Sequence, residues 1–531
     1  MTFLTDMQQL LARNVAQWSD AVAFIDDERE ITYAQFNAMV GKTAAWLGSQ
    51  GIGSGDRVAV WLVNRMEWMC LYFGLARLGA ALVTVNTRYR SHELEYLLEG
   101  SQPKMLVLQV NFRKIDFPAV LRDVRHAAAD TVERVVVVDA QAGMPREILG
   151  KPTVAFDLQR LPEGDATAAG TASSLSILFT TSGTTSGPKL VMHPQRTCTL
   201  HSQNVARSFG MEEQGTRLLA TLPFCGVFGF SAALAAFAAG KPIVLMDTFD
   251  GPAAARLVNR HRVTHVFGSD EMYRLIIANV DGHDPFPSAR MFGFSSFHPG
   301  AAQFAENAWQ RGIPMLGLYG SSEVHALFSI QQRDRPLNER LEAGGMPASP
   351  DAQIRVRDVD TNQIVPVGVS GCIEIKAATN FIGYLNNPEA TAKVIDAEGF
   401  FRTGDIGYLR ADGSFVYQTR QGDAMRLGGY LVSPVEIEDV LKDLPGVADV
   451  QVVAVEIGHQ TRCVAFAIAL PGNALSERTM LDAAAAVLAG FKVPARIWIV
   501  DQFPTTLSSN GTKIQRAQLR DMAVQRLNVA T

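Results

Sequence analysis

The stretch "TTSGTTSGPK" (residues 180–189) decides the fold class of this chain. It combines hydroxyl side chains, two glycines and Lys189, the residue types that surround phosphate groups. The runs "LSILF" (175–179) and "KLVMH" (189–193) on either side are short and apolar, which predicts a loop between two buried strands. A Walker loop would end in Gly-Lys-Ser/Thr and lead into a helix. The stretch therefore predicts a nucleotide site unlike that of P-loop NTPases, although its composition alone also fits a Ser/Thr-rich surface loop.

Short β-branched runs and helical patterns alternate through the first two thirds of the chain. Examples are "RVAVWLV" (57–63), "NRMEWMCLYFGLARLGA" (64–80), "ALVTVN" (81–86) and "RVVVVD" (134–139). Continuous apolar strands that alternate with helices are typical of parallel sheets covered on both faces. The pattern predicts an α/β fold with a large N-terminal domain of mostly parallel sheets flanked by helices.

The pattern of expected strands and helices changes at about residue 350. The segment "DAQIRVRDVDTNQIVPVGVSGCIEIK" (351–376) alternates strand-like and turn-like residues, which predicts a small β-rich subdomain. Beyond "DGSFVYQTRQGD" (412–423) the order of patterns is strand, helix, strand, strand, helix. We therefore predict two domains, 1–421 and 422–531, with a small α+β C-terminal domain that begins at Gly422.

Composition excludes several classes of protein. The 531 residues are too many for one core, and the net charge of −5 gives no general attraction for nucleic acid or membranes. Five scattered cysteines without a CxxC pair indicate neither disulfides nor zinc and favour the cytoplasm. The start "MTFLTDMQQLLARN" (1–14) has no signal-peptide pattern. The apolar run at 229–240 is too short for a membrane span and predicts a buried helix.

Further motifs stand before and after the opening loop in a fixed order. Together with that loop they resemble the signatures of the adenylate-forming superfamily, which includes acyl-CoA synthetases, nonribosomal adenylation domains and firefly luciferase. The resemblance covers nearly the whole chain, and so many motifs in one order make coincidence a poor explanation. The motifs are "ITYAQF" (31–36), "LYGSSEV" (318–324), "GFFRTGDIGYL" (399–409), "TRQGDAMRLGGYLVSPVEIEDVL" (419–441) and "NGTKIQR" (510–516).

The resemblance implies a reaction in two halves. A carboxylate attacks the α-phosphorus of MgATP and gives acyl-AMP and pyrophosphate; a thiol then attacks the acyl carbon, and AMP leaves. Both reactants of the first half are anions, so the site must supply cations and hydrogen-bond donors. The resemblance thus implies ATP, Mg²⁺ and coenzyme A, and a mobile C-terminal domain that rotates between the two half-reactions.

Residue roles follow by position in the motifs, as the resemblance implies them. Lys513 contacts the carboxylate and the α-phosphate, Ser322 bonds the α-phosphate, and Glu323 holds Mg²⁺. Tyr319 stacks on adenine unless it is a core aromatic, and Asp405 accepts the ribose hydroxyls, which suits a group that only accepts. The remaining expected ATP/AMP contacts are Thr181, Ser182, Gly183, Thr184, Thr185, Lys189, Gly320, Ser321 and Arg420, and the CoA tunnel is lined by Gly428 and Gly429, a pair that equally suits a β-turn.

The chain departs from the family pattern mainly around the acid. Gly226 stands where His or an aromatic residue gates the acyl site, which predicts a roomier pocket, and Cys225 beside it is interpreted as a packing residue. Phe297 is expected to project toward the acyl group, and His298 is a substrate contact or a loop histidine. Gly422 stands at the usual hinge position, where glycine permits rotation. The expected acyl pocket is Gly226, Val227, Phe230, Phe297, His298 and Leu318.

These features predict an ATP-dependent carboxylic acid–CoA ligase. Gly226 and "FGFSAAL" (228–234) favour an aliphatic or bulky apolar acid, while aryl and branched acids stay open. An enzyme that loads an acyl carrier protein is the first alternative; Gly229, where amino-acid-activating relatives place Asp, argues against an amino acid. A non-catalytic nucleotide-binding protein is the second, and the retained Glu323, Asp405 and Lys513 speak against it. The expected partners are a small-molecule acid and CoA, with no nucleic acid and no membrane span, and the oligomeric state is open, a homodimer included.

Overall fold

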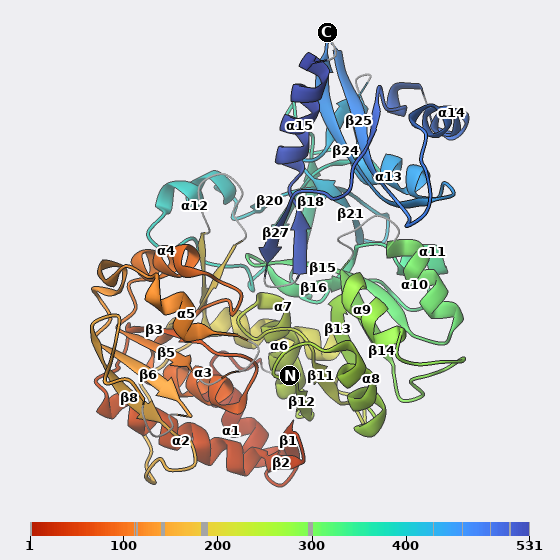
Figure 1. The fold of residues 1–531 in the computed structure, drawn as a ribbon. Coiled ribbons are helices and arrows are strands. Elements are labelled where there is room, and N and C mark those ends of the chain that lie inside the picture. Colours follow the sequence, from red (N-terminus) through yellow and green to blue (C-terminus); the bar gives the residue numbers. More distant parts are fainter. Residues whose placement is uncertain are drawn as a thin grey trace.

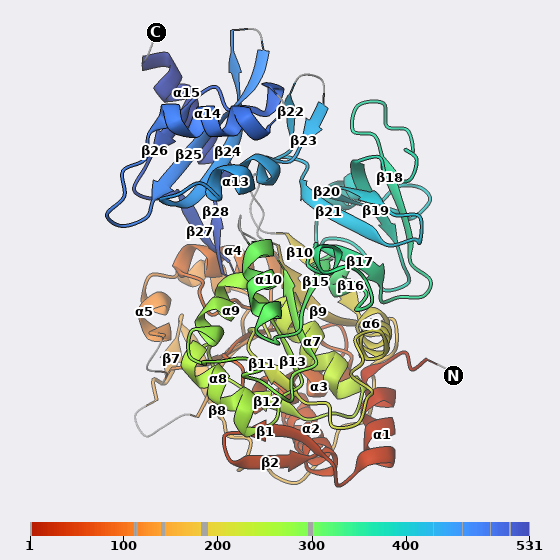
Figure 2. The same ribbon diagram turned by 90° about the vertical axis from the view of Figure 1, so that its right-hand side faces the viewer.

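The computed structural model describes residues 3–529 except 111, 113–114, 140–143, 182–188, 296–300, 428–429, 459, 489 and 509–510. The described residues form a mixed α/β fold with a large N-terminal region and a small C-terminal lobe (Figures 1 and 2). This confirms the predicted fold class. The boundary at Gly422 stays a prediction.

One sheet of the large region contains eight strands among the described residues, in the order β10-β9-β4-β3-β5-β6-β8-β7. Its inner strands are parallel, whereas β10 pairs antiparallel with β9 and β7 with β8. Because β9 and β10 flank the opening loop, the predicted strand–loop–strand setting is confirmed. The bounds are β3 Arg57–Trp61, β4 Ala81–Thr84, β5 Met105–Gln109, β6 Arg134–Val138, β7 Glu147–Ile148, β8 Lys151–Phe156, β9 Leu175–Thr180 and β10 Leu190–Pro194.

A second sheet has thirteen strands within the described ranges, in the order β18-β19-β20-β21-β17-β16-β15-β14-β13-β11-β12-β1-β2. It is parallel from β15 to β1 and antiparallel from β15 to β18. The predicted β-rich subdomain is therefore hydrogen-bonded onto the parallel half as one continuous sheet. The bounds are β1 Val22–Asp26, β2 Arg29–Thr32, β11 Leu218–Ala220, β12 Ile243–Leu245, β13 His265–Ser269, β14 Met291–Ser295, β15 Met315–Ser321, β16 His325–Ile330, β17 Gly344–Pro347, β18 Gln353–Arg357, β19 Gly371–Lys376, β20 Phe401–Leu409 and β21 Phe415–Arg420.

Helices cover both sheets and fill the space between them (Figures 1 and 2). One group packs on the outer face of the eight-stranded sheet, a second lies between the sheets, and a third covers the outer face of the thirteen-stranded sheet. The first group is α4 Ser91–Ser101 and α5 Phe117–Arg122; the second is α1 Met7–Trp18, α2 Tyr33–Ser49, α3 Met66–Leu78, α6 Gln195–Ser208 and α7 Val227–Ala238; the third is α8 Gly251–Arg260, α9 Asp270–Ile277 and α10 Ala301–Gln310. Shorter helices are η1 His126–Ala129, α11 Leu337–Arg340 and α12 Pro388–Val394.

The sequence patterns explain these layers. Ala59 and Trp61 of β3 join the outer core, while Val58 and Val60 join the core between the sheets, as the two-residue period of a strand requires. Every residue of α7 is buried, so the predicted buried helix is confirmed. A helix that is apolar all round needs such a position between layers.

One motif of the resemblance has a local structural reason. Thr32 caps α2: its hydroxyl accepts from the Gln35 backbone N–H at 3.2 Å, and the Gln35 side chain accepts from the Thr32 N–H at 2.9 Å. This is a capping box, which satisfies two backbone donors at the start of a helix. The motif "ITYAQF" (31–36) thus sets where α2 begins.

The C-terminal lobe has two apolar cores of its own. Its elements are β22 Met425–Leu427, β23 Tyr430–Val432, α13 Pro434–Lys442, β24 Val447–Ile457, β25 Gln460–Ala469, α14 Glu477–Val487, η2 Gly490–Lys492, β26 Ile497–Ile499, β27 Thr505–Ser508, β28 Gly511–Ile514 and α15 Arg516–Val529. Figures 1 and 2 both show the hairpin β27–β28 directed from this lobe toward the large region.

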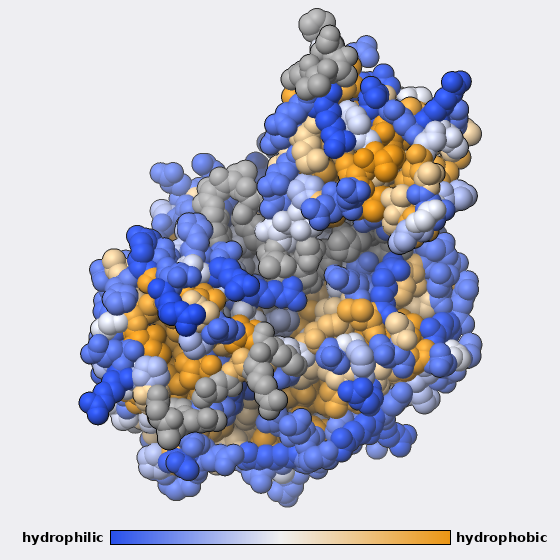
Figure 3. Space-filling model, viewed as in Figure 1, coloured by the Kyte–Doolittle hydropathy of each residue, from blue (hydrophilic) through white to orange (hydrophobic). Residues whose placement is uncertain are grey.

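The surface of the molecule is mixed in polarity. Figure 3 shows hydrophilic residues over most of this face, with hydrophobic residues in patches on both the large region and the C-terminal lobe. Large apolar side chains that are exposed on the lobe include Leu470, Val487 and Ile499. Among the described residues, no helix has the length and apolar character to cross a membrane.

Two glutamates of α13 provide a matched test of the lobe. Glu438 is fully buried and pairs with Arg516 at 2.7 Å, whereas Glu436 pairs with Lys492 at the surface. Removing one partner of a buried pair strands the other charge, so Glu438→Ala is expected to lower the free energy of unfolding by about 3–5 kcal/mol. Glu436→Ala is expected to lower it by less than about 1 kcal/mol. Urea unfolding checks both values, and equal losses would contradict this account of the lobe.

Candidate functional site

The hairpin of β15 and β16 presents the motif "YGSSE" (319–323) at the edge of the sheet's parallel half. The strands come together so closely that a Cβ on Gly320 would lie 2.5 Å from the Ala326 Cα and 2.7 Å from the His325 carbonyl oxygen. No side chain fits there, which explains the glycine of the motif. Ser322 and Glu323 occupy the turn between the two strands.

The structure brings three predicted residues, Tyr319, Asp405 and Arg420, into contact. The Tyr319 hydroxyl donates to Asp405 Oδ2, and Arg420 lies opposite Asp405 in the β20–β21 register with Nη1 2.9 Å from Oδ1. Burial, then the Asp405 charge, holds the pKa of the Tyr319 phenol well above its ordinary value, so the phenol stays a donor. The Asp405 charge raises the pKa of Arg420. A buried carboxylate is thus balanced by one cation and one phenol.

The two ends of the opening loop lie side by side. The Thr181 N–H donates to the Lys189 carbonyl at 2.9 Å, and the Lys189 N–H donates to Thr181 Oγ1 at 3.0 Å. Lys189 Nζ lies 5.0 Å from the centre of the Tyr384 ring, and the Tyr384 hydroxyl donates to Glu323 Oε1 at 3.0 Å. Tyr384, which the sequence did not single out, therefore links the loop lysine to the expected metal ligand.

Several predicted residues lie outside the described part of the structure. Lys513 stands on β28 opposite Thr506 of β27, but its side chain is outside the described part. The residues wholly outside it are Ser182, Gly183, Thr184, Thr185, Phe297, His298, Gly428 and Gly429.

The described residues of the expected acyl pocket are buried at the start of α7 and on β15. Gly226 is the residue before α7, and the ring of Phe230 lies 5.5 Å from that of Phe179, between centroids. Burial raises the pKa of the Cys225 thiol to about 11, which supports the packing interpretation of this residue. A Cβ on Gly229 would lie 2.4 Å from the Pro223 carbonyl oxygen. Packing alone therefore requires Gly229. The position still offers no carboxylate to an α-ammonium group, so the argument against an amino-acid substrate stays a prediction.

Sequence reasoning missed a group of buried histidines behind the hairpin. The ring of His325 lies 3.8 Å from that of His193 and 4.6 Å from that of His201, between centroids. His325 follows the motif "LYGSSEV" (318–324) directly, but no spacing in the sequence joins it to His193 on β10 or His201 on α6. Only the fold brings the three rings together.

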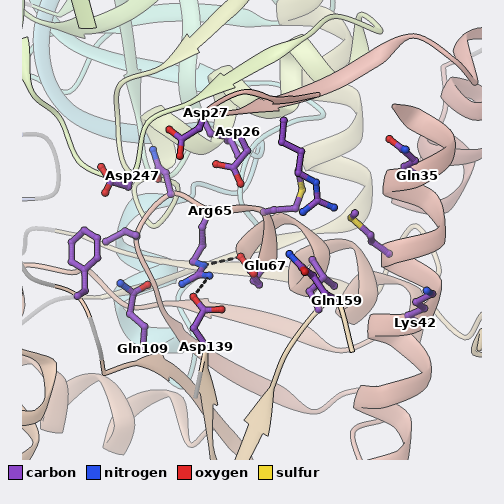
Figure 4. Close-up of a pocket in the computed structure, with 18 of the residues that line it drawn as sticks. Asp26, Asp27, Gln35, Lys42, Arg65, Glu67, Gln109, Asp139, Gln159 and Asp247 are labelled. Carbon is purple, nitrogen blue, oxygen red and sulfur yellow. Dashed lines mark hydrogen bonds and ion pairs between the residues drawn. The ribbon is translucent and has the colours of Figure 1, made fainter. Parts of the chain in front are cut away.

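A large cavity elsewhere contains none of the predicted site residues (Figure 4). It measures about 870 Å³ and lies beyond the ends of β3, β5 and β6, with Gln109 and Asp139 among its lining residues. Figure 4 shows Arg65 between Glu67 and Asp139, and it pairs with both. Because five carboxylates and only three cations line this cavity, it is a poor phosphate site.

Comparison with protein families gives two adjacent matches. The AMP-binding enzyme family matches residues 11–385, and the AMP-binding enzyme C-terminal domain matches residues 436–510. The first match covers more than half of the chain.

Individual relatives are similar over nearly the whole chain. A methyl-dioxo-octahydroindenyl propanoyl:CoA ligase of Rhodococcus jostii is 30% identical and aligns over 97% of this chain and 98% of its own. A 3-hydroxybenzoate–CoA ligase of Aromatoleum is 28% identical over 95% and 94% of the two chains. The crystal structure of ATP-bound MatB from Rhodopseudomonas palustris superposes with a TM-score of 0.81 at 26% identity, over 97% of this chain and 98% of that one.

The contact between Tyr319 and Asp405 can be tested without a ligand. Tyr319→Phe removes a donor from a buried carboxylate and is expected to lower the free energy of unfolding by about 1–3 kcal/mol. Tyr417→Phe is the control, because the Tyr417 hydroxyl makes no hydrogen bond within the part of the chain that the structure describes, and it should cost less than about 1 kcal/mol. Thermal or urea unfolding measures both, and a neutral Tyr319→Phe would contradict the contact.

Proposed function

We propose a role for each site residue in the reaction of this chain. The chain belongs to the AMP-binding enzyme family and is an AMP-forming acid–CoA ligase. It activates a carboxylic acid with ATP as an acyl-adenylate and transfers the acyl group to coenzyme A. The junction of Tyr319, Asp405 and Arg420 supports the residue assignment most directly, because motifs far apart in sequence meet there with complementary charge.

The nucleoside half of ATP is assigned to this junction. Asp405 accepts the ribose hydroxyls, and its orientation is fixed beforehand by Tyr319 and Arg420. The Tyr319 ring packs edge-on against Phe415, with centroids 5.2 Å apart. Another part of the ring is assigned to contact adenine. The Arg420 side chain is half exposed and remains able to reach the ribose or a phosphate. Preorganised groups of this kind avoid a reorganisation cost when the ligand arrives.

The phosphates are assigned to the opening loop and the hairpin turn. Thr181 and Lys189 stand at the two ends of the loop, and Ser322 stands at the turn beside Glu323. We propose that the loop, including Ser182, Gly183, Thr184 and Thr185, holds the pyrophosphate that leaves. Ser322 then bonds the α-phosphate at the point where the acid oxygen forms its bond to phosphorus and the bond to the β-phosphate oxygen breaks.

Glu323 fits the proposed Mg²⁺. Mg²⁺ is usually held by one or two carboxylates together with phosphate and water oxygens. Glu323 also accepts from the Tyr384 hydroxyl, which orients the carboxylate. When bound, the cation would neutralise charge on the phosphates.

Lys513 is assigned to the first half-reaction. It stands on the hairpin β27–β28, which both ribbon views show directed toward the large region. We propose that this arrangement serves adenylation, in which a cation offsets the repulsion between the acid and the α-phosphate. Rotation of the lobe at Gly422 would then place Gly428 and Gly429 along the path of the CoA thiol.

The acid and the cellular setting are narrower proposals. The named relatives act on acids as different as an indenyl propanoate and a hydroxybenzoate, so the comparisons leave the substrate class open. We propose a small-molecule acid and CoA as partners and exclude nucleic acid because the net charge is −5. All five cysteines are free, and four of them are buried, which supports the proposed cytoplasmic location.

A pyrophosphate-release screen over carboxylic acids tests the activity. Acid, ATP and Mg²⁺ are incubated with CoA, with a pantetheinylated carrier protein, or with neither thiol. Acid-dependent pyrophosphate release is expected, with acyl-thioester formed only when CoA is present. Thioester on the carrier but not on CoA would favour the carrier-loading alternative, and ATP binding without release by any acid would favour a non-catalytic protein.

Lys513→Ala separates the two half-reactions. The variant is expected to lower acid-dependent pyrophosphate release by about 100-fold or more, because an electrostatic contact to the transition state is lost. Transfer of the acyl group from added acyl-AMP to CoA should stay within about threefold of the unsubstituted enzyme. Lys492→Ala, a surface lysine of the same lobe, is the control and should leave both rates unchanged. Equal losses in the two half-reactions would contradict the assignment.

A further inference from the structure

The histidine stack, defined as His193, His201 and His325, is buried inside the large region. Each of the three residues is at most 2% exposed. His325 lies between the other two rings, tilted by 30° to His193 and by 14° to His201. Burial lowers the pKa of His193 and His201 to about 4, so these two imidazoles are neutral near pH 7. Among the described residues, the hydrogen bonds of the stack go to carbonyl and hydroxyl groups and none goes to a carboxylate.

The hydrogen bonds of the stack are incomplete. His193 Nε2–H donates to the Ser322 carbonyl and His201 Nε2–H to the Ala326 carbonyl, both at 2.7 Å. His193 Nδ1 lies 3.3 Å from Thr197 Oγ1. Among the described residues, His201 Nδ1 and both nitrogens of His325 have no hydrogen-bond partner. A neutral imidazole carries one donor and one acceptor, so one N–H and two bare nitrogens are left to bind something.

His325 is also held in an unfavourable backbone conformation. Its φ is +64°, in the left-handed region that residues with side chains rarely occupy. Strain of this kind and unpartnered buried polar atoms both cost stability, and they are found where a site is organised for a ligand. Leu327 on the same strand has a similar φ of +63°, so the unpartnered ring nitrogens, rather than the backbone, single out His325.

The stack adjoins the place where the acid must react. His193 bonds the carbonyl of Ser322, the residue assigned to the α-phosphate, and His325 comes two residues after Glu323. The Phe179 ring lies 6.0 Å from that of His193 and 5.5 Å from that of Phe230, between centroids. Phe230 belongs to the expected acyl pocket, so Phe179 packs against both that pocket and the stack.

We propose that the histidine stack is a specificity site that binds a hydroxyl group carried by the acid. A hydroxyl both donates and accepts, so it can accept from the His325 N–H and donate to the bare nitrogen of His201. The inference rests on the proposed function, since it assigns the acid whose carboxylate is adenylated beside Ser322. It replaces the sequence-based preference for a wholly apolar acid with a preference for a hydroxy acid.

Other polar groups fit the stack less well. A carbonyl oxygen only accepts and would leave two ring nitrogens bare. A second carboxylate would bring a charge among neutral imidazoles, and a buried charge without a cation is costly. A buried water is the remaining occupant, and in that case the stack would have no effect on the choice of acid.

Matched pairs of acids test the proposal. Each aliphatic, branched or aryl acid is compared with derivatives that carry one hydroxyl group at successive positions of the same skeleton. The value of kcat/KM for each acid is measured from pyrophosphate release. At least one hydroxy acid is expected to exceed its deoxy partner by about tenfold or more, the value of one good hydrogen bond. His325→Phe should abolish this preference and leave kcat/KM of the deoxy acid within about threefold, whereas His325→Gln should retain part of it.

His265→Phe is the matched control. His265 is equally buried, but both of its nitrogens are bonded, to Thr264 Oγ1 at 2.8 Å and to the Phe209 carbonyl at 2.9 Å. This variant should unfold at a lower temperature and keep the acid preference. Without a ligand, His325→Phe should unfold at or above the temperature of the unsubstituted protein, because it removes polar atoms that have no partner.

Two outcomes would overturn the proposal. One is a deoxy acid that equals or exceeds its hydroxy partner in every pair; the other is a His325→Phe variant that keeps the hydroxyl preference. If no acid supports pyrophosphate release, the proposed function fails. The histidine stack is then tested by ligand binding. Hydroxy acids should raise the unfolding temperature of the unsubstituted protein more than deoxy acids do, and the His325→Phe variant should show no such difference. Should His325→Phe not fold, the His325→Gln variant and the paired acids give the same decision.

Discussion

The hydrogen bond from Tyr319 to the buried carboxylate of Asp405 joins the two halves of the thirteen-stranded sheet, and the candidate site depends on it. Tyr319 ends the parallel half, on β15, and Asp405 lies in the antiparallel half, on β20. A carboxylate that is only 2% exposed needs donors on more than one side, and Arg420 supplies the second. The proposed ribose site is therefore set by backbone register rather than by loops.

The layered fold then determines where an acid can be held. Helices α6 and α7 lie between the two sheets, so a group that enters beside Gly226 meets largely apolar side chains. The buried rings of His193, His201 and His325 are an exception in this part of the core, because their polar atoms are only partly satisfied. Buried polar atoms without hydrogen-bond partners lower the stability of a core. Binding of the proposed hydroxy acid would explain why these atoms are present.

Much of the fold and the reaction class could be predicted from the sequence, because they rest on local patterns. The strands around the opening loop and the buried helix α7 follow from periodicity and hydropathy. Motif order indicated the family. Sequence reasoning gave only one reason for Gly229. The structure adds a second, because its neighbours at Leu222 and Pro223 leave no room for a side chain.

The features that sequence reasoning missed are those made by long-range contacts. Tyr384 reaches Glu323 only because the 380–385 segment returns to the hairpin turn, where the Phe381 N–H bonds the Glu323 carbonyl at 2.8 Å. The histidine stack unites a strand of one sheet, a helix between the sheets and a strand of the other. Glu438 and Arg516 come from two different motifs, and only the structure shows them as one buried pair.

The central claim is that a carboxylate oxygen of the acid attacks the α-phosphorus of ATP. Following ¹⁸O from the labelled carboxylate of an accepted acid, with ATP and CoA present, tests it most directly. Mass spectrometry of the products should find one ¹⁸O in AMP and none in pyrophosphate, because the bond between the acyl carbon and the bridging oxygen breaks when the thiol attacks. Label in inorganic phosphate together with ADP, or unlabelled AMP beside the thioester, would contradict the account.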